Sequence, residues 1–286
     1  MKASYARAMY GVQGAEGTVA DTWLPIGLVD RPHVEIPAGI ERIYSVGDWN
    51  AKELSEGMTL ANVGFSIVAL EEWDLLQQAR RSDVTGELPW LSFKWGYIKG
   101  AVHLTVTVID LKVDTMTLRC DAGGRVNVDM ALIGGKVEKA DADPGNMDFF
   151  GSRAYRWFEM VWDETRDLLA FEMNVRNNLT PQPVIAGSGT TRDPDRKWDY
   201  LDEGNNEIDG TLSYFLGDAT IDLQACLIEG ANHDLAFQTC ADVSPAQAAT
   251  LTLTELKLTG EDHQANVGGN IVVVSPFMAT DWEVTD

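Results

Sequence analysis

The chain has few of the residues that build metal centres and disulfide frameworks. Four histidines occur in 286 residues, and none has a second histidine three or four positions away, so the spacing of a zinc site is missing. The three cysteines form no C-x-x-C pair, and we interpret them as reduced structural thiols. These residues are His33, His103, His233 and His263, and Cys120, Cys226 and Cys240. The sequence predicts no metal and no cofactor.

Basic residues and long apolar runs are scarce as well. The chain has 22 Lys and Arg against 44 Asp and Glu, which gives a net charge of −22 and a sequence pI of about 4.4. Without a Lys/Arg cluster, this balance disfavours binding to a phosphate backbone by counterion release. No run approaches the roughly 18 apolar residues of a membrane span, and residues 1–7 lack the apolar core of a signal peptide. We expect a protein made in the cytosol with no membrane partner.

Catalytic motifs are the third absence. Gly187-Ser188-Gly189 lacks the flanking pattern of a nucleophile elbow. Residues 193–197 begin like a calcium loop, but Lys197 stands where the third oxygen ligand belongs. The acidic residues from 190 to 207 could hold a cation, although a solvated acidic loop is the favoured interpretation. The sequence therefore predicts a protein that is not an enzyme.

The clearest structural signal lies between Thr115 and Ile133, where two alternating segments flank a glycine pair at 123 and 124. The apolar positions are Met116, Leu118 and Cys120 before the turn, and Val126, Val128, Met130 and Leu132 after it. This period of two predicts a β-hairpin with one buried face, and Asp-Ala-Gly-Gly suits its turn. The opposite face is polar and carries both signs of charge. Such a hairpin borders water on one side, as in a sandwich, a barrel wall or a channel wall.

The rest of the chain predicts a mainly β fold with one or two short flanking helices. Strands are predicted at 23–36, broken by prolines, at 58–68, 89–95, 102–113, 210–216, 251–258 and 271–274, and a hairpin at 155–162 with 168–176. Residues 70–81 have helical spacing, with acids first and arginines last, and Asp218 is expected to cap a second helix to about residue 228. Residues 1–22 and 177–206 lack periodicity, so we predict an arm and a long loop that are mobile in the monomer and contact neighbouring copies.

The two halves repeat the same order of elements. Residues 57–60 (Gly-Met-Thr-Leu) precede a strand, a helix and more strands, and Gly210-Thr211-Leu212 does likewise. The best internal boundary is formed by the Gly134-Gly135 pair and the turn cluster at 141–146. We therefore predict an N-terminal arm at 1–22, a first module at 23–145 and a second at 146–286, related by duplication, with a single domain as the alternative.

Three segments together resemble one viral family. They are Val113-Asp114-Thr115-Met116-Thr117-Leu118 with the following turn and Val128-Asp129-Met130-Ala131-Leu132-Ile133-Gly134-Gly135-Lys136, then Phe171-Glu172-Met173-Asn174-Val175-Arg176-Asn177-Asn178-Leu179, and Ile271-Val272-Val273-Val274-Ser275-Pro276-Phe277-Met278-Ala279. In order and spacing they resemble the central hairpin, the strand ending in Asn-Asn and the closing strand of tail tube proteins from long-tailed phages and archaeal tailed viruses. The resemblance covers most of residues 55–280.

This resemblance implies a structural virion protein of a siphovirus-like tail, assembled in the host cytoplasm into stacked rings. The inner wall would be a β-barrel of about two dozen strands, four from each tube module, so that duplication implies trimeric rings and a single module hexameric ones. The implied partners are further copies of the chain, the tape measure protein, and the tail terminator and tail tip proteins. Viral DNA would pass through without specific binding. We predict that the lumen is lined by Thr115, Thr117, Arg119, Asp121, Arg125, Asn127, Asp129, Glu172, Asn174 and Arg176.

Two other function classes compete with this interpretation. One is another β-rich structural protein of a virion or injection system. The other is a carbohydrate-binding or hydrolytic β-sandwich, which nine tryptophans and many carboxylates would suit. The tryptophans are spread along the chain beside apolar neighbours, as in Trp157-Phe158, which favours a structural role for them.

Overall fold

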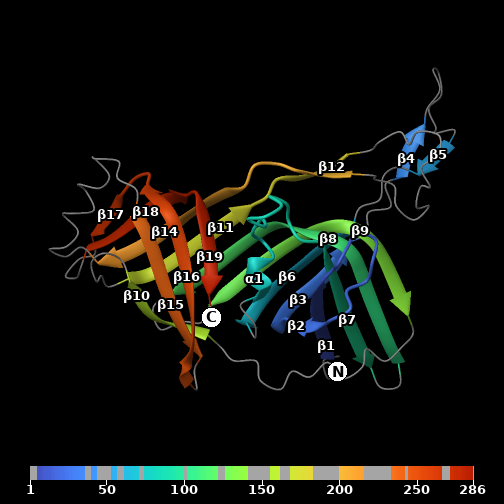
Figure 1. The fold of residues 1–286 in the computed structure, drawn as a ribbon, viewed down its shortest axis with the longest axis horizontal. Helices are drawn as coiled ribbons and strands as arrows, with labels where there is room; N and C mark the ends of the chain where they lie inside the picture. The colour runs from blue at the N-terminus through green and yellow to red at the C-terminus, as the bar shows by residue number, and fades with distance from the viewer. Residues whose placement is uncertain are drawn as a thin grey trace.

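The computed structural model describes residues 5–35, 40–43, 53–56, 61–70, 74–99, 102–121, 126–140, 155–161, 168–182, 200–215, 233–241, 244–265 and 271–285 (Figure 1). One antiparallel sheet joins fifteen strands, and two short two-stranded ribbons stand apart from it. The prediction of a mainly β fold is therefore confirmed.

The first half contributes β1 (Tyr5–Val12), β2 (Leu24–Pro25), β3 (Gly27–Glu35), β4 (Ile40–Ile43), β5 (Glu53–Glu56), β6 (Ala61–Leu70), α1 (Asp74–Gln77), β7 (Leu91–Lys99), β8 (Val102–Asp121) and β9 (Asn127–Ala140). The second half contributes β10 (Tyr155–Val161), β11 (Leu168–Arg176), β12 (Leu179–Gln182), β13 (Tyr200–Glu203), β14 (Glu207–Phe215), β15 (His233–Ala241), β16 (Ser244–Leu258), β17 (Asp262–Ala265), β18 (Ile271–Ala279) and β19 (Asp281–Thr285).

The predicted hairpin forms the centre of the sheet as β8 and β9. Met116 lies opposite Met130 and Leu118 opposite Val128, and the seven apolar positions of the pattern are at most 3% exposed. Each such side chain contributes roughly 1.5–3 kcal/mol on burial, so the alternation in the sequence sets the register. The hairpin prediction is confirmed, and it underestimated the length, because residues 102–121 form one continuous strand.

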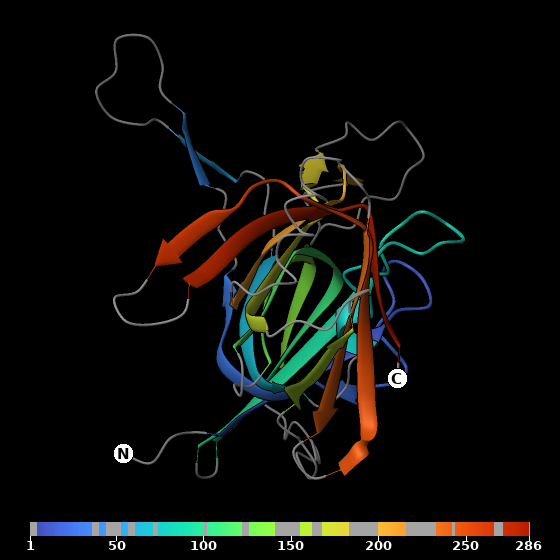
Figure 2. The same cartoon turned by 90° about the vertical axis from the view of Figure 1, so that its left-hand side faces the viewer.

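Two irregularities bend β8. The register to β9 shifts between Val113 and Thr115, and Asp110 has a positive φ of 58°. Bulges of this kind increase the local twist of a strand. The N-terminal part of β8 pairs with β7, which pairs with β1, and these strands pack over the core. Phe93 of β7 therefore stacks on Phe65 of β6, with ring centroids 5.2 Å apart. Figure 2 shows the resulting curved sheet, with β3 and β6 to one side of β8 and β9.

The strand pairing repeats itself along the chain. In the first half the spatial order is β3-β6-β9-β8, and β8 also pairs with β7, which pairs with β1. In the second half it is β11-β14-β18-β16, and β16 also pairs with β15, which pairs with β10. In each set, the strands that lie side by side are the first, second, fourth and third of the set along the chain. The two sets join where β8 pairs with β11, which gives one continuous run.

Both halves share one hydrophobic core. In the second half, Phe171 and Phe277 stack with centroids 6.0 Å apart, and Trp282 of β19 is fully buried beside them in the same cluster. Leu75 and Leu76 of α1 and Ala79 after it belong to that cluster too. Gln77 of α1 donates to the carbonyl of Val284 in β19, and Arg80, just after the helix, forms an ion pair of 2.6 Å with Asp281 of β19. The core thus lies behind the β8–β9 hairpin.

Several local predictions are wrong. Residues 5–12 of the predicted arm form β1, with Ala8 and Tyr10 in the core; the Ala- and Gly-rich sequence obscured an alternation that packing against β7 supplies. Within the predicted helix 70–81, α1 covers Asp74–Gln77. Residues 78 and 79 form a turn after it, Arg80 lies in a bend, and Arg81 follows in irregular structure.

The predicted hairpin at 155–176 is also wrong. β10 pairs with β15 and β11 pairs with β8 and β14, because each finds its partner in the repeated strand order rather than in its neighbour along the chain. The predicted long loop at 177–206 begins and ends as the ribbon β12–β13. The predicted helix at 218–228 lies outside the described residues.

Candidate functional site

A polar surface covers the side of the central strands that faces away from the core. One cross-strand row contains Ser66, Asp129, Thr117, Asn174 and Asp209, contributed in order by β6, β9, β8, β11 and β14. Residues directly opposite in neighbouring strands point to the same side of a sheet. We call this surface the polar face. Its described members are Ser66, Asn127, Asp129, Thr115, Thr117, Arg119, Asp121, Glu172, Asn174, Arg176, Glu207, Asp209 and Thr211.

Hydrogen bonds connect the polar face across its strands. The hydroxyl of Thr117 donates to Asn174 at 2.8 Å, and the Asn174 amide donates to Asp209 Oδ1 at 3.2 Å. Ser66 donates to Asp129 at the other end of the row. Within the row, side-chain bonds therefore join β6 to β9, and β8 to β11 and β14, in addition to the backbone ladders.

Both arginines of the polar face are paired with acids. Arg119 Nε lies 2.9 Å from Glu172 Oε2, and Arg176 donates to Asp209 Oδ2 at 2.6 Å. These pairs are solvated, so each contributes at most about 1 kcal/mol of stability. Five carboxylates, those of Asp121, Asp129, Glu172, Glu207 and Asp209, stand against these two guanidinium groups. The described face is therefore net negative and has no unbroken cationic track for a phosphate backbone.

The structure brings the predicted lining residues together. Thr115, Thr117, Arg119 and Asp121 lie on β8, Asn127 and Asp129 on β9, and Glu172, Asn174 and Arg176 on β11, all on the polar face and all exposed or half-buried. Arg125 lies outside the described residues. The prediction missed Ser66 of β6 and Glu207, Asp209 and Thr211 of β14. In β14, these polar residues alternate with buried residues such as Ile208 and Leu212. This alternation in the sequence could have identified them as members of the polar face.

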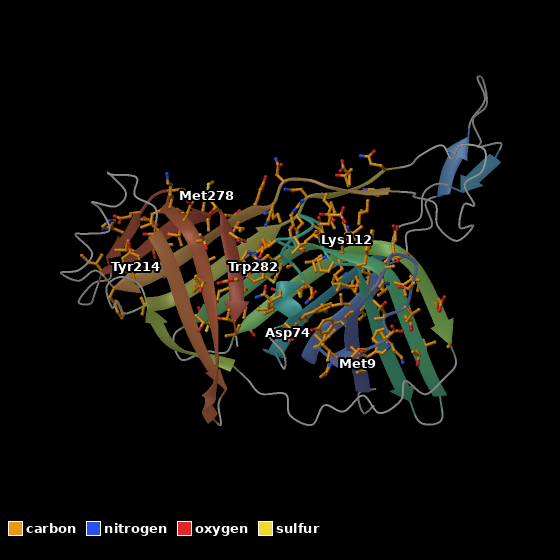
Figure 3. The ribbon with its side chains drawn as sticks, in the orientation of Figure 1. Met9, Asp74, Lys112, Tyr214, Met278 and Trp282 are labelled. Carbon is orange, nitrogen blue, oxygen red and sulfur yellow. The ribbon has the colours of Figure 1, made fainter. Side chains whose placement is uncertain are left out.

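At one end of the polar face, the ribbon β12–β13 leaves the sheet (Figures 1 and 3). Lys112, 5% exposed, pairs with Glu203, 11% exposed, and its Nζ lies 4.0 Å from the centroid of the Trp90 ring. The backbone N–H of Leu88 donates to Glu203 at 3.1 Å, and Arg81 lies 3.4 Å from the same carboxylate. Figure 3 labels Lys112 where the ribbon departs. A nearly buried charge cluster therefore fixes the base of the ribbon.

The Asn-Asn pair noted in the sequence forms the corner at which β11 becomes β12. The buried Asn177 side chain donates to the carbonyl groups of Val113 at 2.9 Å and Ala79 at 3.0 Å, which connects β8 to the end of α1. Asn178 has a positive φ of 50°, a conformation that asparagine tolerates, and its carbonyl accepts a bond from the Gly204 N–H. The ribbon thus begins in a fixed direction.

The described residues contain little that would suit catalysis. Among them, no group of three His, Cys, Asp or Glu side chains could hold a metal ion. Trp95 and Trp282 are buried, and Trp23 and Trp90 are half-buried, so these four are not the exposed platforms of a glycan site. No helix within the described part of the chain is long and apolar enough to cross a membrane.

Comparison with protein families identifies the family of the chain. The model of the family described as phage tail tube protein matches residues 59–278, which is more than half of the chain. The chain belongs to this family. A search of the curated proteins gives no match. The matched region of the tail tube protein begins just before β6 and ends in β18, and it includes every described residue of the polar face. The protein is therefore a structural component of a phage tail.

Proposed function

We propose that this tail tube protein polymerises into stacked rings, and that the polar face lines the channel through which viral DNA reaches the host. The observation that carries the proposal is the continuous run β3-β6-β9-β8-β11-β14-β18-β16, whose strands β6, β9, β8, β11 and β14 have the polar face on one side and the core on the other. A water-filled barrel wall requires this combination of faces. The role is structural and needs no catalytic group.

The repeated strand order supports three chains in each ring. Each repeat contributes four strands to the run, so one chain contributes eight, and three chains supply the two dozen strands that the family resemblance implies. Two modules, 23–145 and 146–286, would then be related by duplication. Head-to-tail contacts between unlike edges close such a ring.

The two margins of the run differ. Among the described strands, β3 pairs only with β6, and it contains Pro32 and a register shift between Asp30 and His33. At the other margin β18 pairs with β16 at one end and with the four-residue strand β17 at the other, and β17 has no second described partner. Proline is tolerated where a strand lies at an edge. Pairing of the β3 and β17 edges with those of neighbouring copies would close the barrel.

Stacking would use the ribbons. β4–β5 is inserted between β3 and β6, and β12–β13 is inserted between β11 and β14, so each repeat carries one ribbon at the same point in its strand order. Figure 1 shows both ribbons leaving the body on the same side. We propose that they contact the next ring, and that the tape measure, tail terminator and tail tip proteins complete a tail assembled in the host cytoplasm.

Electron microscopy of the purified protein tests this function. We expect hollow tubes built from rings with threefold symmetry, and a ring mass of three chains by mass photometry. Dispersed monomers under all polymerising conditions would contradict the function. Rings of six chains would contradict the proposed duplication but would be consistent with the tube function.

A further inference from the structure

β8 and β16 hold the same place in the two repeats, and they share a local sequence and an unusual backbone conformation. Asp110-Leu111-Lys112 in β8 corresponds to Glu255-Leu256-Lys257 in β16. The acid that begins each triplet has a positive φ, 58° in β8 and 49° in β16, which is uncommon for residues other than glycine. The leucine that follows is fully buried in both strands. Lys257 is therefore the counterpart of Lys112.

The strand registers extend this correspondence to the neighbouring strands. Lys112 lies opposite Ile133 of β9, and Lys257 lies opposite Met278 of β18. The spacing along the chain from Lys112 to Lys257 equals the spacing from Ile133 to Met278. Met278 is therefore the counterpart of Ile133.

The two ribbons correspond in the same way. In β12–β13, Leu179 lies opposite Glu203, and in β4–β5, Ile40 lies opposite Glu56. Each glutamate ends its ribbon, has a leucine two positions before it and is followed by a glycine. Glu56 is therefore the counterpart of Glu203, and Ile40 that of Leu179.

Within one chain, these positions form a closed contact between the first repeat and the ribbon of the second. Lys112 is 5% exposed because it pairs with Glu203 at the base of β12–β13. Beside it, Ile133 packs against Leu179 and Leu201 of the same ribbon. A lysine and an apolar side chain of the sheet thus receive a glutamate and two leucines of the ribbon.

The corresponding place in the second repeat is open. Lys257 is exposed, and Met278, labelled in Figure 3, is 60% exposed. Figure 1 shows the ribbon β4–β5 at the opposite end of the molecule from β16 and β18, so the same chain does not cover this place. An open hollow here is lined by Glu255, Lys257, Met278, Ala279 and Thr280.

We propose that this hollow receives the base of the ribbon β4–β5 of the next copy in the ring, where Lys257 pairs with Glu56 and Met278 packs against Ile40 and Leu54. The contact that joins the two repeats within one chain is then repeated between chains. The inference rests on the proposed function, because ring closure brings the β3 edge of one copy to the β17 edge of the next. The partner is a second copy of this chain, and the hollow is incomplete without it.

The test exchanges the two charges. Lys257→Glu and Glu56→Lys each place like charges at the contact, and each should raise the protein concentration for half-maximal ring assembly by about tenfold or more. Both changes in one chain restore opposite charges at every contact, so the double variant should assemble within about threefold of the unaltered chain. Assembly is measured by mass photometry over a concentration series, and urea denaturation verifies that each monomer is folded.

The control variant is Lys139→Glu, which makes the same change in charge at an exposed residue of β9 and should assemble as the unaltered chain does. Normal assembly of either single variant, or a double variant that assembles no better than the single ones, would overturn the inference while rings still form. Equal impairment of the control would also overturn it, because net charge would then be the cause. If the unaltered chain forms no rings, the proposed function fails, and the inference with it.

Discussion

At the residue scale, the charge cluster under the ribbon has the greatest energetic consequence. Removing one member of a nearly buried ion pair leaves the other charge uncompensated, at a cost of about 3–5 kcal/mol. We therefore expect Glu203→Gln to lower the free energy of unfolding of the monomer by about this amount, measured by urea denaturation. The double variant Lys112→Met with Glu203→Leu should recover part of the loss, because it removes the buried pair but leaves Arg81 and the Leu88 N–H without their carboxylate partner.

The exposed pair Arg119 and Glu172 serves as the control for that experiment. Both side chains are solvated, so Arg119→Ala should change the free energy of unfolding by at most about 1 kcal/mol. Similar losses for Arg119→Ala and Glu203→Gln would show that burial does not distinguish the two pairs.

A second residue-scale prediction concerns acid. Burial raises the pKa of Asp281, but hydrogen bonds from Arg80 and the Trp282 N–H lower it further, and the net pKa is below the usual value. The same contact raises the pKa of Arg80. A carboxyl with a lowered folded-state pKa stabilises the fold above its unfolded pKa of about 3.9, and this contribution disappears as pH falls through the folded value.

The measurement compares urea midpoints of the unaltered chain and Asp281→Asn from pH 7 to pH 2. We expect a constant difference above about pH 5 that shrinks below about pH 4. A difference that grows on acidification would contradict the assignment of the Arg80 contact as the dominant influence on Asp281.

At the element scale, the proposed role of the ribbons in stacking can be tested by shortening one of them. Replacing residues 184–198 with Asn-Gly would connect β12 to β13 by a tight turn while leaving the pairing of Gln182 with Tyr200 intact. We expect this variant to fold and to form rings that do not stack, as seen by electron microscopy. Normal tubes from it would show that the removed segment is not needed for stacking. The unaltered chain, polymerised in parallel, is the control.

Elements also differ in how far the sequence predicts them. The β8–β9 hairpin and the polar residues of β11 could be predicted, because one face is buried and the alternation is uninterrupted. β1 could not, since Ala8 and Gly11 carry little signal and the strand exists through its pairing with β7. The predicted pairing of β10 with β11 was wrong, because the strand nearest along the chain is not the nearest in space.

At the scale of the whole molecule, the excess of acid determines how the proposed channel treats DNA. The chain carries a net charge of −22, and the described polar face has more carboxylates than guanidinium groups. In a closed tube, this charge would repel DNA from the wall over a Debye length of roughly 8 Å at physiological salt. Arg119 and Arg176 would attract the DNA phosphates only weakly, because Glu172 and Asp209 already balance their charges.

The corresponding prediction reverses the charge at two exposed positions of the polar face. Asp121→Lys with Asp129→Lys places cations in the channel at every ring, and we expect tubes to assemble while DNA delivery slows, because the phosphates would bind the wall by counterion release. The control, Asp21→Lys with Glu283→Lys, makes the same change in net charge at exposed residues outside the polar face and should deliver DNA normally. Delivery is measured as the rate of potassium efflux or DNA release after adsorption. If both variants deliver DNA at the unaltered rate, these residues do not line the channel, whereas equal slowing in both would make net charge, and not its position, the cause.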